Sequence, residues 1–134
     1  MNRLSMSTEP TDTAPLVLLV DDDEDSRVLY AEYLTAVSGY RVVEAADGRE
    51  AIELAGANAP AAIVMDVSLP VLDGKEAMRV LRKSEKTSRI PIVALSGYTN
   101  VRDANDPETE FQVVLVKPCL PDALAKAIES VLRR

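Results

Sequence analysis

Five short apolar runs recur along the chain, separated by longer stretches of mixed polarity. The middle runs are rich in β-branched residues and lack alternating polar positions, which is typical of parallel strands buried on both faces. The sequence therefore predicts five strands. They cover residues 16–20, 41–45, 61–65, 90–95 and 113–116.

The stretches between these runs carry apolar residues at helical spacing. Alternating strands and helices predict an α/β domain whose parallel sheet is covered by helices on both faces. Gly39 and Gly56 stand where helices are expected to end, because glycine readily adopts the left-handed conformation of a C-cap. The predicted helical faces comprise Tyr30, Tyr33, Leu34 and Val37; Ala51, Ile52, Leu54 and Ala55 within 49–57; Ala77, Met78 and Leu81 within 75–83; and Leu124, Ala127, Ile128 and Val131.

The organisation of the chain is simple. Residues 1–14 are polar and lack apolar periodicity, so we expect a flexible N-terminal tail followed by one domain over residues 15–134. No apolar stretch approaches the roughly 18–20 residues of a membrane span, and the N-terminus lacks the apolar centre of a signal peptide. These features favour a cytoplasmic protein without membrane contact.

Charge and composition exclude several kinds of site. The 22 acidic and 15 basic side chains give a net charge of −7, which disfavours direct binding of nucleic acid or anionic membrane. A single cysteine, Cys119, excludes an internal disulfide, and the absence of histidine excludes catalytic triads and most zinc sites. The remaining chemistry belongs to carboxylates, hydroxyls and lysines.

Reactive side chains stand where the predicted strands end. The first strand runs into five acidic residues, 21–25, and the third ends at Asp66. Ser96 and Lys117 follow the fourth and fifth strands. Because ligands of such sheets bind beyond the carboxyl ends of the strands, we expect these groups to share one site.

This set of groups suits a metal-assisted phosphoryl transfer. Neighbouring carboxylates repel one another, and a divalent cation relieves the repulsion. Oxygen ligands in small number favour Mg²⁺ over Ca²⁺. Asp66 is then the natural nucleophile for an acyl phosphate, with Lys117 stabilising charge on the phosphoryl oxygens and Ser96 offering a hydroxyl.

Four segments of the sequence resemble the signatures of receiver domains of two-component response regulators. The segments are LLVDDDED, IVMDVSLPVLDG, VALSGY and LVKP, and they follow the family's order. Asp22 and Asp66 are 44 positions apart, Ser96 lies 30 further on, and Lys117 another 21. The resemblance covers about residues 16–132. It implies a flavodoxin-like (βα)5 doubly wound sandwich with strand order 2-1-3-4-5.

The resemblance also implies a set of metal ligands. Asp22 and Asp66 would bind Mg²⁺ directly, with Mn²⁺ as a substitute, and Asp21 would bind it through water. The backbone carbonyl of Ser68 would be a further ligand. Pro70 and Gly74 resemble the loop that follows the phosphorylated strand, with Gly74 opening the next helix.

Further implications concern transfer and output. Asp66 would accept a phosphoryl group from a phosphohistidine on a sensor histidine kinase or histidine phosphotransfer protein, and would lose it slowly by autodephosphorylation. Ser96 would turn toward the phosphoryl group, Lys117 would pair with it, and the Lys117–Pro118 bond would be cis. We expect a stand-alone receiver, monomeric or weakly dimerising on phosphorylation, that signals to a downstream protein; a receiver excised from a hybrid kinase would look the same.

Two departures from the family pattern keep an alternative open. Val114 stands where the family has its aromatic switch residue. The segment 99–112 lacks apolar periodicity and contains Pro107, so we expect a short, displaced or frayed helix there. The alternative is a docking scaffold whose phosphorylation is uncoupled from output. A flavin binder or a phosphohydrolase fits less well, because the first turn is acidic and Ser68 replaces a hydrolase's second carboxylate.

Plainer interpretations apply to several residues. Asp23, Glu24 and Asp25 are expected to be the solvated start of a helix. Cys119 is expected to be a buried, inert side chain.

Overall fold

The computed structural model describes residues 13–67, 74–97 and 112–133. Residues 1–12 of the predicted tail, Ser68 and Pro70, and all of the 99–112 segment except residue 112 lie outside this part. The expectations placed on them therefore stay predictions, as does the domain boundary at residue 15.

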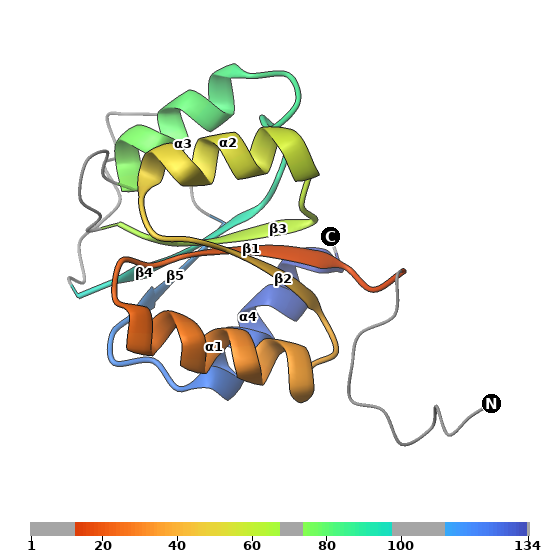
Figure 1. The fold of residues 1–134 in the computed structure, drawn as a ribbon, viewed down its shortest axis with the longest axis vertical. Helices are drawn as coiled ribbons and strands as arrows, with labels where there is room; N and C mark the ends of the chain where they lie inside the picture. The colour runs from red at the N-terminus through yellow and green to blue at the C-terminus, as the bar shows by residue number, and fades with distance from the viewer. Residues whose placement is uncertain (1–12, 68–73, 98–111, 134) are drawn as a thin grey trace.

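Five strands form one parallel sheet of order β2-β1-β3-β4-β5, which confirms the predicted topology (Figure 1). Every neighbouring pair is parallel, and β1 pairs residue by residue with β2 from Leu16–Arg41 to Val20–Ala45. The strands are β1 (Leu16–Val20), β2 (Arg41–Ala45), β3 (Ala62–Asp66), β4 (Ile92–Ser96) and β5 (Val113–Val116).

Four described helices cover the two faces of this sheet. In Figure 1, α2 and α3 lie on one side of the sheet and α1 and α4 on the other. Because parallel strands are joined through crossover helices, this arrangement carries every strand's carboxyl end to the same edge. The helices are α1 (Glu24–Ala36), α2 (Gly48–Asn58), α3 (Gly74–Lys83) and α4 (Pro121–Leu132).

The two faces of the sheet carry separate cores. On β1, Leu18 and Val20 pack with the α2–α3 layer, whereas Val17 and Leu19 pack with the α1–α4 layer. Successive strand side chains point to opposite faces, so a strand that is apolar throughout serves both layers. Strands β1, β3 and β4 are almost wholly buried, as their continuous apolar runs predict.

Two predictions about the helices are wrong, one about where α2 ends and one about the burial of Val37. Gly56 lies inside α2, which continues to Asn58, and Ala59 takes the left-handed conformation at φ 47°. Pro60 explains this position, because a proline disfavours right-handed helix at the residue before it. Val37 is 65% exposed and follows the end of α1, so it is no part of the core.

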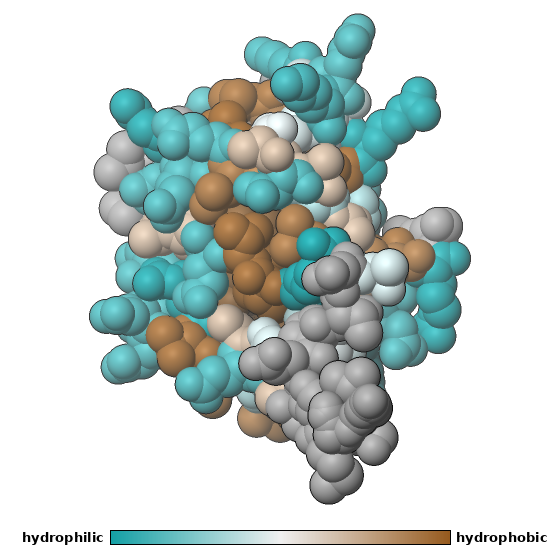
Figure 2. All heavy atoms as spheres, turned by 45° about the vertical axis from the view of Figure 1, so that its right-hand side comes forward, coloured by the Kyte–Doolittle hydropathy of each residue, from teal (hydrophilic) through white to brown (hydrophobic). Residues whose placement is uncertain are grey.

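Gly39 adopts φ +78° just after α1, as its predicted role in ending that helix requires. Hydrophilic side chains cover the helical layers in Figure 2, and apolar side chains show mainly at the level of the sheet between them. Among the described residues, no helix combines the length and the hydropathy needed to cross a membrane.

Candidate functional site

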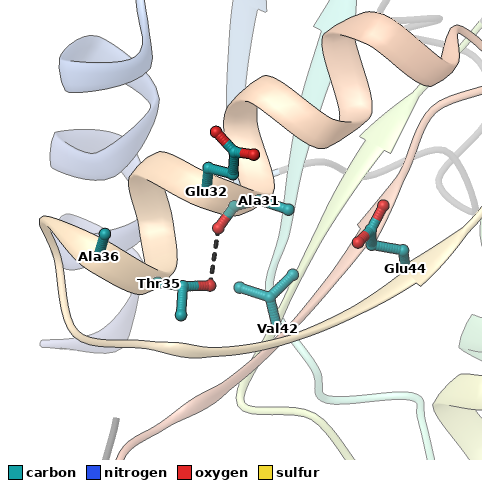
Figure 3. Close-up of a pocket in the computed structure, with 6 residues that line it drawn as sticks. All are labelled: Ala31, Glu32, Thr35, Ala36, Val42 and Glu44. Atoms are coloured by element: carbon teal, nitrogen blue, oxygen red, sulfur yellow. Dashed lines mark hydrogen bonds between the residues drawn. The ribbon is translucent and has the colours of Figure 1, made fainter. Parts of the chain in front are cut away.

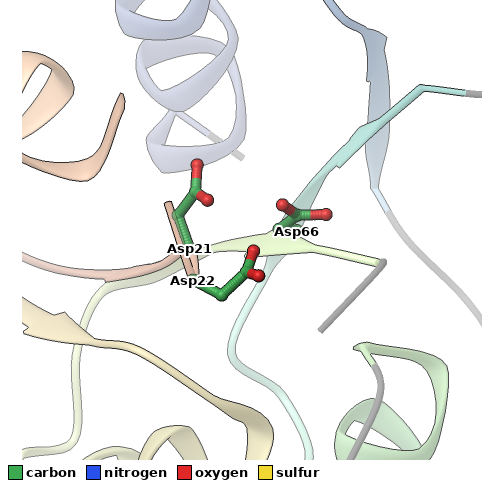
Figure 4. Close-up of side chains that lie close together, drawn as sticks. All are labelled: Asp21, Asp22 and Asp66. Carbon is green, nitrogen blue, oxygen red and sulfur yellow. The ribbon is translucent and has the colours of Figure 1, made fainter. Parts of the chain in front are cut away.

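Three carboxylates converge where β1 and β3 end. Asp21 and Asp22 follow the last residue of β1, and Asp66 is the last residue of β3. One carboxylate oxygen of each lies within 4.8 Å of the others (Figure 4). The three carboxylates thus lie together at the carboxyl ends of the strands.

Asp21 carries the clearest sign that this cluster is incomplete by itself. Its side chain is fully buried, and its Oδ1 accepts a hydrogen bond of 2.9 Å from the amide of Asp23. Its Oδ2 is buried and has no hydrogen-bond partner among the described residues. Burial raises the pKa of Asp21, although the Asp23 amide and the charge of Lys117 act in the opposite direction. A buried carboxylate oxygen without a donor is costly, and a bound cation would satisfy it.

Lys117 brings a positive charge to the same place. Its Nζ donates to Oδ2 of Asp66 at 2.7 Å and lies 3.9 Å from Oδ2 of Asp21. Burial alone would lower the pKa of Lys117, but the hydrogen bond and charge of Asp66 outweigh it and the pKa is raised. The Lys117–Pro118 bond is cis, as the family resemblance predicts.

Ser96 lies beside this pair. It is buried at the end of β4, where the sheet register places Leu95 opposite Asp66 and Ser96 opposite Val116. Its carbonyl oxygen accepts a 2.7 Å hydrogen bond from the amide of Lys117. Of the predicted site residues, the structure thus gathers all except Ser68, which lies outside the described residues.

Gly74 packs directly against the main chain that carries Asp66. It opens α3, as predicted, and its amide donates to the carbonyl of Val67 at 3.2 Å. A Cβ atom at this position would lie 2.5 Å from the carbonyl oxygen of Asp66 and 2.6 Å from the Cα of Val67. Only glycine allows α3 to approach the backbone of Asp66 so closely.

Two residues of α1 hold the site from one side, and sequence reasoning missed both roles. Arg27 donates to the carbonyl of Asp21 at 2.8 Å and to Oε1 of Glu44 at 3.0 Å. Tyr30 donates through its hydroxyl to the carbonyl of Cys119 at 2.6 Å. The sequence offered one signal, an arginine and a tyrosine three positions apart on one predicted helix. It could not identify their hydrogen-bond partners, which lie outside that helix.

The plainer interpretation of the acidic residues 23–25 is confirmed, whereas that of Cys119 as a buried side chain is not. Asp23 is the N-cap of α1 and accepts from the amide and hydroxyl of Ser26, while Glu24 and Asp25 occupy the exposed first turn. Cys119 is half-buried rather than buried, it packs against the α1–α4 core, and burial raises the pKa of its thiol.

A separate hollow of about 440 Å³ lies between α1 and β2 (Figure 3). The hydroxyl of Thr35 points along this hollow but is bonded to the carbonyl of Ala31 in its own helix. None of the converging carboxylates lines it, so we do not assign the chemistry there. Its lining residues are Ala31, Glu32, Thr35, Ala36, Val42 and Glu44.

Known proteins resemble this chain over most of its length. The transcriptional regulatory protein PrrA of Mycobacterium tuberculosis is 37% identical over 123 residues, which are 91% of this chain and 52% of PrrA. The probable transcriptional regulator ycf27 of Cyanophora paradoxa is 38% identical over 119 residues, which are 88% of this chain and 48% of that protein. The chain thus spans about half the length of these relatives.

Solved structures agree with the sequence relatives. The receiver domain of the sensor histidine kinase PA1611 from Pseudomonas aeruginosa, with a magnesium ion coordinated in its active site cleft, superposes with a TM-score of 0.82 at 31% identity, covering 91% of this chain and all of that one. The chemotaxis response regulator CheY4 of Vibrio cholerae gives 0.79 at 33% identity, covering 89% and 99%.

The sequence model described as the response regulator receiver domain matches residues 17–129, a span that begins in β1, ends in α4 and contains every residue of the acidic cluster. A match of this extent leaves little of the chain unaccounted for. The protein therefore belongs to the family of response regulator receiver domains, the receiving modules of two-component signalling.

Proposed function

We propose that Asp66 accepts a phosphoryl group from a phosphohistidine on a sensor histidine kinase or a histidine phosphotransfer protein, in a reaction that depends on Mg²⁺. The observation that carries this proposal is the pairing of Asp66 with Lys117 at 2.7 Å beside a buried oxygen of Asp21 that has no hydrogen-bond partner among the described residues. A nucleophilic carboxylate, an ammonium group and a cation site then share one sheet edge.

The acidic cluster fits a divalent cation. Asp21, Asp22 and Asp66 supply oxygen atoms within 4.8 Å of one another, and hard oxygen ligands suit Mg²⁺ or Mn²⁺. The family resemblance adds the carbonyl of Ser68 as a further ligand. When bound, the ion would neutralise charge on the carboxylates and on the oxygens of the transferring phosphoryl group.

The chain's own groups would carry the transfer. One oxygen of Asp66 forms a bond to phosphorus while the phosphorus–nitrogen bond of the donor breaks, and the released imidazole nitrogen takes up a proton. Lys117 moves its ammonium group from the carboxylate to the phosphoryl oxygens, where negative charge gathers. Ser96 donates its hydroxyl to the same oxygens. Water later attacks the acyl phosphate, which returns Asp66 and releases phosphate.

Phosphorylation by acetyl phosphate or phosphoramidate tests this function. Intact mass measurement should show one phosphoryl adduct that requires Mg²⁺ and is absent from Asp66→Asn. Asp22→Asn should bind Mg²⁺ more weakly and accumulate less adduct at low Mg²⁺. An adduct of the same yield in Asp66→Asn would move the acceptor elsewhere and overturn the proposal.

One observation favours a second function, a docking scaffold whose output is independent of phosphorylation. Val114 is half-buried, pairs with Ala94 across the sheet and packs against the α2–α3 core. A valine held in this way cannot swing toward Ser96 as an aromatic ring does in a family switch. Binding of the downstream protein with and without beryllofluoride distinguishes the two: equal affinities support the scaffold, and unequal affinities support the switch.

A further inference from the structure

The hydroxyl of Tyr30 connects parts of the chain that are 89 residues apart. It donates at 2.6 Å to the main-chain carbonyl of Cys119, just beyond the Lys117–Pro118 bond. The side chain of Tyr30 is only 7% exposed and belongs to the α1–α4 core. A buried hydrogen bond thus joins α1 to the turn that carries Lys117.

Main-chain bonds fix the two ends of this turn. On the sheet side, the amide of Lys117 donates to the carbonyl of Ser96 at 2.7 Å. On the other side, Leu120 is the N-cap of α4; its exposed side chain makes no capping bond, and its carbonyl accepts from the amides of Ala123 and Leu124 in the first turn of the helix. Between the sheet bond at Lys117 and the start of α4 at Leu120, the hydroxyl of Tyr30 binds the main chain of the turn at Cys119.

We propose that Tyr30 is a positioning residue for Lys117, holding the turn so that the lysine ammonium lies on Asp66. The proposal rests on the phosphoryl transfer argued above, but it concerns a residue that contacts neither the phosphoryl group nor the metal. One turn earlier on the same helix, Arg27 holds the carbonyl of Asp21. Helix α1 thus aligns the acidic side of the site through Arg27 and the basic side through Tyr30.

Packing alone does not require the hydroxyl. A phenylalanine at position 30 would fill the same space, so the hydroxyl contributes the bond to Cys119 and little else. Tyr40 provides the comparison within this protein. It is 9% exposed and belongs to the same core, but its hydroxyl has no hydrogen-bond partner among the described residues.

The test compares Tyr30→Phe with the matched control Tyr40→Phe in the full chain. We expect Tyr30→Phe to lower the phosphorylation rate by phosphoramidate at saturating Mg²⁺ by about tenfold, because the ammonium group loses its orientation. Its Mg²⁺ dissociation constant, measured by calorimetry, should stay within about twofold of the original. Tyr40→Phe should change neither quantity.

A double-mutant cycle shows whether the effect passes through the lysine. In a Lys117→Gln background, Tyr30→Phe should cause no additional loss of rate. An equal loss in both backgrounds would overturn the proposal, as would an unchanged rate in Tyr30→Phe alone. A readout that needs no phosphoryl transfer is the ¹⁵N signal of the Lys117 ammonium group. We expect it to broaden in Tyr30→Phe and to stay sharp in Tyr40→Phe, and an unchanged signal would also overturn the proposal even if the chain proved inactive.

Discussion

At the scale of single residues, the clustered carboxylates of the site lower the folding stability of the metal-free protein. Within the described part of the chain, the buried Oδ2 of Asp21 has no hydrogen-bond donor, and two other carboxylates lie close to this side chain. Such an arrangement costs stability unless a cation is present. Lys117 offsets part of this repulsion through its bond to Asp66.

Replacing Asp21 with asparagine should therefore stabilise the metal-free protein. We expect the free energy of unfolding to rise by on the order of 1–3 kcal/mol, since a buried unsatisfied charged oxygen is removed. The same variant should lose most of the stabilisation that Mg²⁺ gives the original chain. Urea unfolding with and without MgCl₂ measures both effects. The exposed Asp22, changed to asparagine, serves as the control with a smaller effect in the absence of metal, and a destabilised Asp21→Asn would contradict this account.

A substitution at Gly74 should have the opposite effect and destabilise the protein. An alanine here would place its Cβ against the backbone of Asp66 and Val67, so α3 must shift. We expect Gly74→Ala to lower the free energy of unfolding by roughly 1–3 kcal/mol and to slow phosphorylation. Gly56→Ala is the matched control, because a Cβ at that helical position meets nothing within 4 Å. It should stabilise the protein by up to about 1 kcal/mol, and equal effects of the two substitutions would refute the argument.

At the scale of elements, α1 and α2 begin at aspartate caps that stand shortly after the ends of β1 and β2. Asp47 caps α2 by accepting from the amide of Glu50 at 2.8 Å, and the carboxylate of Glu50 accepts from the amide of Ala46 at 2.7 Å. This reciprocal arrangement satisfies two amide donors where the helix begins. Asp23 caps α1 beside the acidic cluster by accepting from the amide and the hydroxyl of Ser26.

Asp47→Ala should show how much a capping bond distant from the acidic cluster contributes to the free energy of unfolding. We expect the free energy of unfolding to fall by about 1 kcal/mol, and Asp47→Ser to retain most of it. Urea denaturation followed by circular dichroism checks the order of the three proteins. Phosphorylation should be unaffected, and a serine variant as unstable as the alanine variant would argue against the capping bond.

The elements also show where sequence reasoning was strong and where it was not. The apolar run of β3 predicted a strand buried on both faces, and all five of its residues are buried. The end of α2 was misplaced because Gly56 was a visible stop signal, whereas Ala59 adopts its left-handed conformation in front of Pro60. Helix ends depend on such local competition, while strands depend on long apolar runs that are easy to see.

At the scale of the whole molecule, several groups with raised pKa values act together. Burial is the main cause for Tyr30, Tyr40 and the thiol of Cys119. For Lys117 the cause is the hydrogen bond and charge of Asp66, which outweigh burial. Each group keeps its proton to a higher pH in the folded chain than in the unfolded chain.

Stability should therefore fall as the pH rises into the alkaline range. The contribution of these groups is fully present below their ordinary pKa values, 9.0 for the thiol and 10.0 for the phenols, and is lost as the pH rises through the raised values. Urea midpoints between pH 8 and pH 11 measure this loss. Tyr40→Phe removes one of the groups and should flatten the decline, and a midpoint that rises over this range would contradict the assignment.

The sequence by itself determined the architecture and the convergence of acidic and basic side chains at one edge of the sheet. Apolar periodicity depends on local burial, so it predicted the strands and helical faces, and strand-end positions predicted that Asp21, Asp66 and Lys117 would meet. Only the tertiary structure decided the connections across the chain: the unpartnered oxygen of Asp21, the approach of Gly74 to Asp66, and the bond from Tyr30 to Cys119. These depend on distances between residues far apart in sequence, which arise only when both layers have packed onto the sheet.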